Sequence, residues 1–221
     1  VHVHHGLWRT GRETSDEATR NMVDAVVQKA RLSPGMTLCD VGCGYGSTAR
    51  IIAREQQVQV TGLTVSAAQH RYAESVTSAE ERVTFLIEDW LHNERPASAC
   101  DALIAVESTE HMADKARVFS EAARVLKPGG RLVVCAWLAA GKLTAREHRH
   151  LIEPICREGR MPGMGTESEY RHWMTKAESS NGRLQAAMAI GVDVITSDIT
   201  AYPTIPPSTA TMKVGWRMIS F

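Results

Sequence analysis

Residues 36–46 constrain the fold of this chain more than any other stretch. The apolar run 36–41 predicts a short buried strand, and it is followed at once by three glycines with the spacing G-x-G-x-G, Gly42, Gly44 and Gly46. Glycine lets a backbone turn sharply and approach a ligand closely. Because a helical pattern begins at Ser47, the turn would point backbone N–H groups at the space above a sheet. The pattern predicts a nucleotide-type cofactor site, and the alternative is a tight strand-to-helix turn without a ligand.

Strand and helix patterns alternate along most of the chain. Strands are predicted at 58–65, 83–87, 100–106, 131–137, 192–199 and 212–221, the last as a possible antiparallel partner, and helices at 15–30, 47–56, 67–77 and 114–125, with a turn at 126–130. This succession predicts an α/β fold with a doubly wound, mostly parallel, seven-stranded sheet, because right-handed crossovers bury both faces of such a sheet. No second domain boundary is visible, so 1–221 is interpreted as one domain.

The pattern changes after the fifth predicted strand, between residues 138 and 175. Residues 144–155 and 167–177 are helical in pattern, and a Gly/Met/Pro segment, 160–165, lies between them. An insertion at this point would lie over the carboxyl edge of the sheet and could form a lid of Met and aromatic side chains for an apolar acceptor. The alternative is a packing pair of helices that never touches a ligand.

Charge, hydropathy and cysteine usage exclude several classes of protein. Lys+Arg and Asp+Glu number 25 each, which argues against a nucleic-acid binder that relies on bulk positive charge. The sequence contains no apolar run of about 18 residues, so it predicts no membrane span. The five cysteines form no C-x-x-C pair, which favours a reducing compartment, and we expect a cytoplasmic protein. A homo-oligomer is compatible with the sequence, which does not decide the oligomeric state.

The N-terminal residues raise two further questions. The chain starts at Val1 without Met, so we expect that an N-terminal part is missing. Three histidines, His2, His4 and His5, suggest a metal at first sight, but no Cys or acidic partner lies beside them in the sequence. We therefore expect no metal site, and favour a tag remnant or a segment that faces the substrate.

Polar residues follow the predicted strands at the edge where open α/β sheets place their ligands. Thr64 ends the second strand, where a hydroxyl could bond a ribose, and Asp89 and Trp90 follow the third. The carboxylate of Asp89 could accept a hydrogen bond from the amine of an adenine framed by the aromatic ring or its backbone. The alternative is a solvated acidic turn with Trp90 in the core. Glu107 and His111 follow the fourth strand in the same way.

These residues carry a family likeness over almost the whole chain. Three motifs, 40–46, Glu88-Asp89-Trp90 and Leu126-Lys-Pro-Gly-Gly130, resemble in order and spacing those of class I S-adenosylmethionine-dependent methyltransferases. Residues 4–8, 106–115 and 157–173 look like the small-molecule group around tocopherol, sterol, sugar and natural-product methyltransferases. The segment 177–191 departs from that pattern, and the N-terminal helix that normally comes before the His-Gly-Trp segment is absent.

The resemblance implies a Rossmann-like fold, S-adenosylmethionine as cofactor and S-adenosylhomocysteine as product. From the zero net charge we also expect no nucleic-acid partner. The resemblance implies these cofactor contacts: Asp40, Gly42, Gly44, Gly46, Leu63, Thr64, Gln69, Asp89, Trp90, Glu107 and Ser108. It implies these contacts to a small-molecule acceptor: Trp8, His111, Met164 and Trp173.

The implied reaction is displacement of a methyl group from a cationic sulfur, which depends mainly on positioning of the two reactants. A phenol or enol acceptor also loses a proton, and His111 is the leading candidate for the base because its ordinary pKa lies near neutrality. Glu107 is the second candidate, and it could instead stabilise positive charge on a carbon acceptor. The alternative for His111 is a helix-start residue bonded to backbone.

The predicted function is O- or C-methylation of a small, largely apolar acceptor. One rival is a catalytically altered cofactor-binding protein of the same fold, such as a cyclase or a protein without enzymatic activity. The other is a protein or nucleic-acid methyltransferase. The zero net charge and the lack of an Asn/Asp-Pro-Pro-Tyr/Phe motif after the fourth strand argue against the common nucleic-acid methyltransferases.

Overall fold

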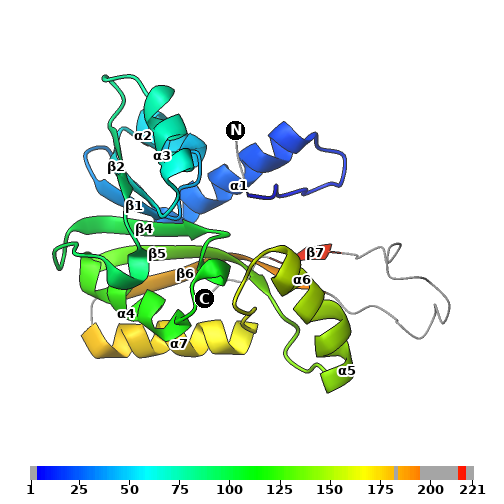
Figure 1. The fold of residues 1–221 in the computed structure, drawn as a ribbon. Coiled ribbons are helices and arrows are strands. Elements are labelled where there is room, and N and C mark those ends of the chain that lie inside the picture. The colour runs from blue at the N-terminus through cyan, green and yellow to red at the C-terminus, as the bar shows by residue number, and fades with distance from the viewer. Residues whose placement is uncertain (1–3, 182–183, 195–213, 218–221) are drawn as a thin grey trace.

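The fold is built on a single mixed sheet (Figure 1). The structure is a computed structural model that describes residues 4–181, 184–194 and 214–217. The sheet has the order β3-β2-β1-β4-β5-β6-β7. Its strands are β1 (Thr37–Val41), β2 (Gln59–Thr64), β3 (Val83–Ile87), β4 (Cys100–Val106), β5 (Leu126–Leu138), β6 (Leu184–Val194) and β7 (Val214–Arg217).

The pairing of the strands confirms the predicted doubly wound α/β class. β1 to β6 pair in parallel and β7 is antiparallel to β6. From β1 the chain winds outward through β2 to β3, and then returns to place β4 on the other side of β1. The order of the strands therefore reverses between β1 and β4, and open α/β sheets bind ligands outside the carboxyl ends of their strands at such a point.

Helices cover both faces of the sheet. The long ones are α1 (Ser15–Ala30), α2 (Ser47–Gln56), α3 (Ala67–Ser75), α4 (Lys115–Val125) and α7 (Glu167–Asn181). The short ones are α5 (Ala145–Glu147), η3 (His148–Ile152), α6 (Glu153–Glu158), η1 (Trp90–His92) and η2 (Thr109–His111). Side-chain caps explain several helix starts, since Thr14, Ser66 and Asp114 each accept a backbone N–H of the first turn.

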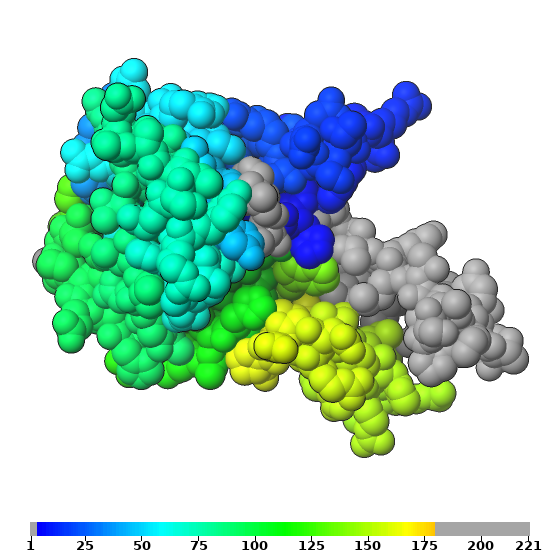
Figure 2. Space-filling view, turned by 45° about the horizontal axis from the view of Figure 1, so that its top comes forward, coloured from blue at the N-terminus to red at the C-terminus, as the bar shows by residue number. Residues whose placement is uncertain are grey.

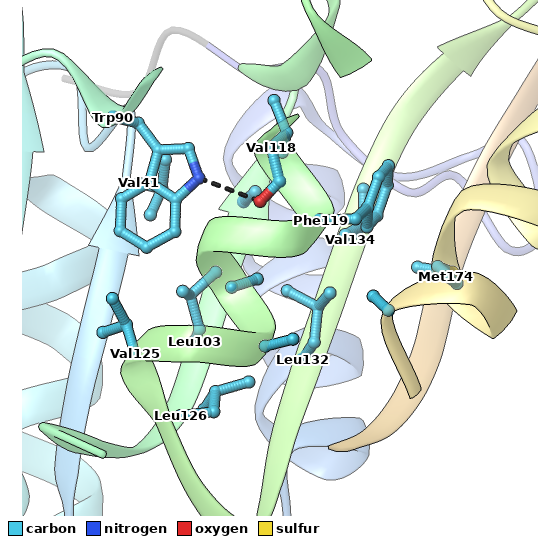
Figure 3. Close-up of a cluster of buried hydrophobic side chains, with 14 of the residues drawn as sticks. Val41, Trp90, Leu103, Val118, Phe119, Val125, Leu126, Leu132, Val134 and Met174 are labelled. Carbon is cyan, nitrogen blue, oxygen red and sulfur yellow. Dashed lines mark hydrogen bonds between the residues drawn. The ribbon is translucent and has the colours of Figure 1, made fainter. Parts of the chain in front are cut away.

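Alternation along the strands divides the core into two clusters, one on each face. Leu103 and Leu132 belong to the cluster beneath α4 and α7, whereas Ile104 and Val133, their neighbours in sequence, belong to the cluster beneath α1 and α2. Figure 3 shows the first cluster, in which Val118 and Phe119 of α4 meet side chains of the strands. Because both faces are buried, the parallel strands are apolar on both sides.

Two predicted boundaries in the second half of the sheet were wrong. The predicted turn 126–130 is the first part of β5, with a register shift where Cys100 pairs with Leu126 and Ala102 with Arg131. The sixth strand begins at Leu184 rather than 192, because an alanine-rich segment is held by its pairing with β5 rather than by β propensity. Its predicted end, 195–199, lies outside the described residues.

The predicted lid is wrong for its second helix. Tyr170, Met174 and Ala177 of α7 are buried in the core, and the helix packs beside α4 as the crossover between β5 and β6. Residues 145–158 are helical as predicted, and Figure 1 shows α5 and α6 beyond the carboxyl ends of the strands. A lid role for these two short helices stays a prediction.

Candidate functional site

The glycine turn after β1 is tied to the end of β2. The backbone N–H groups of Gly42 and Cys43 both donate to the carbonyl of Leu63, at 2.9 Å. Gly42, Gly44 and Gly46 have φ values of +83°, +57° and +77°, which glycine adopts without strain. A Cβ on Gly42 would lie 2.3 Å from the Cβ of Ser108, so a side chain cannot be accommodated at this position. The turn therefore needs glycine for its sharp conformation, as predicted, and also for its closeness to Ser108 after β4, which was not predicted.

α2 begins directly after this turn. Gly46 is its N-cap and provides no side-chain capping bond, and the first turn of the helix contains no acidic residue. A Cβ on Gly46 would lie 2.3 Å from the ring of Phe85, so a side-chain cap could not replace it without moving that ring. The positive end of the α2 dipole thus faces the carboxyl edge of the sheet, and no carboxylate in the first turn neutralises it. This helix start suits an anionic group of a ligand.

Asp40 lies on β1 beneath the turn and has an unsatisfied carboxylate oxygen. Its side chain is buried, and Oδ2 has no hydrogen-bond partner, the one such buried side-chain atom among the described residues. Burial raises the pKa of Asp40 to about 7. An unpartnered buried carboxyl group is costly, and a cationic ligand group would remove that cost. This is compatible with the cofactor contact predicted for Asp40, which stays a prediction.

Thr64 and Gln69 lie together at the end of β2, as the predicted ribose contact requires. The Thr64 hydroxyl donates to Oε1 of Gln69 at 2.7 Å and accepts from the N–H of Ser66 at 3.1 Å. Thr64 is buried, so its hydroxyl is engaged inside the protein and Gln69 is the more accessible of the two. The Leu63 side chain is in the core, and this residue contributes to the site through its backbone carbonyl, which accepts the N–H groups of the glycine turn. Ribose binding stays a prediction.

Two exposed apolar residues next to Thr64 were missed by the sequence analysis. Val65 is 73% exposed and Ile87, which pairs with Thr64 in the sheet, is 56% exposed. Both end predicted strands, 58–65 and 83–87. The signal that could have found them is their position at the carboxyl ends of β2 and β3, since Val65 follows the last residue of β2 and Ile87 is the last residue of β3. They offer an apolar surface at the carboxyl edge.

The structure separates the two predicted adenine contacts. Asp89 is half exposed and accepts hydrogen bonds from the N–H of Leu91, at 2.9 Å, and from Nδ1 of His92, at 2.8 Å. Trp90 is buried, and its indole donates to the carbonyl of Val118 at 3.1 Å (Figure 3). The prediction that the Trp90 ring frames a ligand is therefore wrong, because α4 covers it, and only its backbone remains a candidate.

Glu107 is held by the N-terminal segment. Both of its carboxylate oxygens accept the backbone N–H of His5 at 3.1 Å, and Oε2 lies 2.8 Å from Nδ1 of the same residue. The imidazole of His5 packs edge-on against the Trp137 ring of β5, with 4.7 Å between ring centroids. The hydrogen bond to Glu107 raises the pKa of His5, against an opposing effect of burial. His5 was not among the predicted catalytic residues, because only the fold brings it to Glu107.

Glu110 is a second residue that the predicted site left out. It is buried, its Oε1 accepts the backbone N–H of Trp137, and its Oε2 lies 3.3 Å from the hydroxyl of Thr109. The Thr109 hydroxyl in turn lies 2.8 Å from that of Tyr170. Burial, with a smaller contribution from Glu107, raises the pKa of Glu110 to about 7. The acidic run after β4 therefore includes a buried carboxyl group whose pKa is raised toward neutrality.

The predicted acceptor contacts are not gathered in one place. Trp173 stacks on Phe119, 6.2 Å between centroids, on the α4–α7 face of the sheet, which gives it a packing role. The indole of Trp8 donates to the carbonyl of Glu13. His111 is exposed at the end of η2, where its backbone N–H donates to the carbonyl of Ser108. The acceptor roles of Trp8, His111 and Met164 stay predictions.

Two further features concern metal binding and membrane insertion in the described part of the chain. In that part, no cluster of three or more His, Cys, Asp or Glu side chains could hold a metal ion. Over the same residues, no helix combines the length and the apolar character needed to cross a membrane.

Comparison with known proteins identifies the family. The family described as "Mycolic acid cyclopropane synthetase" matches residues 6–190, which is most of the chain. The chain belongs to this family. The predicted likeness to small-molecule methyltransferases is thereby confirmed.

Curated relatives of the chain are named as methyltransferases of small molecules. The chain is 36% identical over 135 residues to 27-O-demethylrifamycin SV methyltransferase of Amycolatopsis mediterranei (strain S699), covering 60% of this chain and 50% of the relative. It is 26% identical over 189 residues to the chloroplastic tocopherol O-methyltransferase of Arabidopsis thaliana, covering 76% and 54%. Thus the chain spans about half the length of the curated relatives it matches.

A solved structure extends the comparison to the fold. The crystal structure of the cyclase SpnF superposes with a TM-score of 0.68 at 29% identity, covering 80% of this chain and 63% of SpnF. Members of the same fold thus include a protein named as a cyclase as well as proteins named as methyltransferases.

Proposed function

We propose that this chain binds S-adenosylmethionine and transfers its methyl group to oxygen or carbon of a small, largely apolar acceptor. The observation that carries the proposal is the buried, unpartnered carboxylate oxygen of Asp40 beneath a glycine turn that has no room for a side chain at Gly42. The family match and the names of the relatives support the same reaction.

The residues present fit this cofactor. Asp40 would face its amino group, and the N–H groups at the open start of α2 would face its carboxylate. Gln69 and Asp89 lie where ribose and adenine contacts are expected, and the exposed side chains of Val65 and Ile87 provide an apolar surface beside them. When bound, the cofactor supplies an electrophilic methyl group on a cationic sulfur.

The carboxylates after β4 determine the electrostatics of the reaction site. Glu107 and Glu110 are close enough for the charge of Glu107 to raise the pKa of Glu110. Negative charge at this edge favours a cationic ligand group and would stabilise positive charge that develops on a carbon acceptor. The chain itself therefore contributes binding, orientation and a field of the correct sign, which is most of what such a displacement needs.

The acceptor assignment rests on apolar side chains and on the named relatives. Trp137 lies at the carboxyl end of β5 beside His5, and the short helices α5 and α6 lie beyond the same edge. The names of two relatives refer to a rifamycin and a tocopherol, which are small molecules with large apolar parts. The cytoplasmic location, the absence of a nucleic-acid partner and a homo-oligomeric state remain predictions.

Calorimetry and methyl transfer test the proposal in two steps. S-adenosylhomocysteine should bind to the purified chain, and the variant Asp40→Ala should weaken binding at least about tenfold through loss of one charge-assisted contact. Label from methyl-labelled S-adenosylmethionine should then appear in phenolic or alkenyl acceptors. Transfer to RNA or protein lysate but not to these small acceptors would contradict the proposed substrate class.

A second function is favoured by one observation, the structural likeness to SpnF. A cyclase or a non-enzymatic relative would bind the cofactor and leave its methyl group in place. Bound cofactor that remains unconsumed over the panel of acceptors would favour this alternative, whereas accumulation of S-adenosylhomocysteine would exclude it.

A further inference from the structure

The N-terminal segment crosses the carboxyl edge of the sheet above the glycine turn. His4 Nε2 lies 3.0 Å from the hydroxyl of Thr48, in the first turn of α2, and His5 is bonded to Glu107 at the end of β4. Farther along, Leu7 is buried and its N–H donates to the carbonyl of Ala18 in α1 at 2.7 Å. In Figure 2 the darkest blue residues lie between the cyan and the yellow-green parts of the molecule. The segment therefore spans the region where the cofactor is expected.

The imidazole of His5 is fixed in this position by three kinds of contact. Its backbone N–H and its Nδ1 both bond the carboxylate of Glu107, and its ring packs against Trp137. The Glu107 side chain is 8% exposed, whereas that of His5 is 53% exposed. The carboxylate is thus the buried partner and the imidazole faces outward.

This geometry determines the tautomer of His5. A carboxylate only accepts, so Nδ1 carries the proton that is donated to Glu107, and Nε2 of the neutral ring carries the lone pair. Within 4–181, 184–194 and 214–217, no hydrogen bond engages Nε2. A histidine oriented by a buried carboxylate, with its second nitrogen open, has the arrangement of a general base.

The charges around the ring suit the same role. Glu107 and Glu110 are the charged groups that act on the His5 ring, and both raise its pKa, while burial lowers it. An imidazolium formed by proton uptake would therefore be stabilised where it forms. Glu107 has a left-handed backbone with φ +48°, which an L-residue adopts at a cost, so the surrounding structure maintains the backbone conformation from which its side chain projects.

We propose that His5 and Glu107 form a base dyad, and that the acceptor is accordingly a hydroxyl compound, such as a phenol, an enol or an alcohol. The inference rests on the proposed function. The acceptor O–H bond breaks and its proton passes to Nε2 of His5. Its oxygen bonds the methyl carbon as the carbon–sulfur bond breaks, and that electron pair remains on sulfur.

His111, the base predicted from the sequence, has no comparable arrangement. Its side chain is exposed at the end of η2, and no orienting partner for its ring is present in the part of the chain that the structure describes. The dyad therefore replaces His111 as the base in the proposed reaction, and Glu107 keeps a role as the residue that orients His5.

Nuclear magnetic resonance tests the dyad independently of turnover. The imidazoles would be labelled with ¹³C, the His5 signal assigned with His5→Gln, and the titration followed in the presence of S-adenosylhomocysteine. We expect His5 to titrate above its ordinary pKa, and Glu107→Gln to lower that pKa while the signal of exposed His172 stays unchanged. An equal His5 pKa in both proteins would overturn the dyad.

Kinetics test the base itself, with 4-hexylphenol and 2-methylhydroquinone as acceptor probes. For His5→Gln we expect kcat to fall about 100-fold at pH 8, and the acidic limb of the pH profile to disappear. The affinity for S-adenosylhomocysteine should change less than about threefold, because a general base acts on the acceptor. His172→Gln should behave like the wild type, and His111→Ala should lose less activity than His5→Gln.

The outcomes distinguish the inference from the proposed function. Full turnover in His5→Gln, or a loss of cofactor affinity as large as the loss of turnover, would show that the segment is only a structural clamp. Turnover of alkenyl but not of hydroxyl acceptors by the wild type would also overturn the inference. A wild type that binds cofactor and methylates no probe would instead contradict the proposed function, and with it the base assignment.

Discussion

The hydroxyl of Ser108 donates a 2.5 Å hydrogen bond to the backbone carbonyl of Val41, and so joins the carboxyl ends of β4 and β1. Ser108 was predicted as a cofactor contact, but it is buried and its hydroxyl is used within the protein. Ser108 instead restricts position 42 to glycine, because the Cβ of Ser108 lies where a side chain at position 42 would have to lie. The ligand-binding turn is therefore shaped from β4 as well as from β1.

Gly42→Ala should lower the free energy of unfolding by at least about 2 kcal/mol, since it adds a clash with Ser108 to the strain of positive φ. Thermal or urea unfolding measures the loss. Gly129→Ala is the matched control, because Gly129 also has positive φ but open space around its Cβ position. There we expect only the strain of about 1–2 kcal/mol. Equal losses in the two variants would contradict the role given to Ser108.

Asp40→Asn should stabilise the chain and weaken the binding of S-adenosylhomocysteine. Above pH 7 the buried carboxylate is ionised without a partner, so the neutral amide should raise the free energy of unfolding by roughly 1–3 kcal/mol. The pKa of Asp40 is raised from 3.8 to about 7, so the folded state binds its proton more tightly than the unfolded state. Wild-type stability should rise as pH falls from 7 toward 4, and the advantage of the variant should shrink over that window.

Urea unfolding at several pH values checks this sign. An advantage of Asp40→Asn that is constant from pH 8 to pH 4 would show that Asp40 has no raised pKa. Cofactor affinity of the wild type should change in the opposite sense and weaken below about pH 7, because a protonated carboxyl group cannot pair with an ammonium group.

Asp89→Ala should weaken S-adenosylhomocysteine binding about five- to tenfold, if the half-exposed carboxylate accepts a hydrogen bond from the adenine amine. Calorimetry gives the affinity directly. The control is His92→Ala, which removes the histidine partner of Asp89 and leaves its carboxylate in place. Unchanged affinity in Asp89→Ala would remove Asp89 from the site and leave it as the N-cap of η1.

Trp90→Phe should reduce stability and leave cofactor affinity intact. The indole of Trp90 fills the core beside α4 and donates to the carbonyl of Val118, so its loss should cost about 1–2 kcal/mol. Chemical unfolding measures this cost, and calorimetry on the same variant measures the affinity. A large loss of affinity with normal stability would restore the predicted contact between this side chain and the ligand.

Local sequence patterns determined the first half of the fold with small errors. The predicted helix 47–56 and the strands 83–87 and 100–106 have the observed bounds, because period, caps and glycines act within a few residues. The capping box of Thr14 and Glu17 similarly begins α1. Three glycines after an apolar run were also enough to locate the turn, because few residues other than glycine adopt those φ values readily.

Which of the predicted site residues are exposed depends on tertiary packing. Asp89 and Trp90 are adjacent in sequence, yet one faces solvent and the other is covered by α4, 28 residues away along the chain at Val118. Likewise α7 has an aromatic pattern that suits a lid, but its Tyr170 is buried against Phe119. Burial of a side chain depends on what packs over it, and a local pattern does not contain that information.

Dependence on tertiary packing also explains why His5 was not predicted as the base. The sequence determined a cofactor turn, a family likeness and an acidic run after the fourth strand, all from short segments with their own spacing. His5 and Glu107 are 102 positions apart, and no period or motif links them. Their hydrogen bond exists because α1 anchors the N-terminal segment across the carboxyl edge where β4 ends. Contacts between distant segments depend on the packing of the whole sheet, so the fold alone brought these two side chains together.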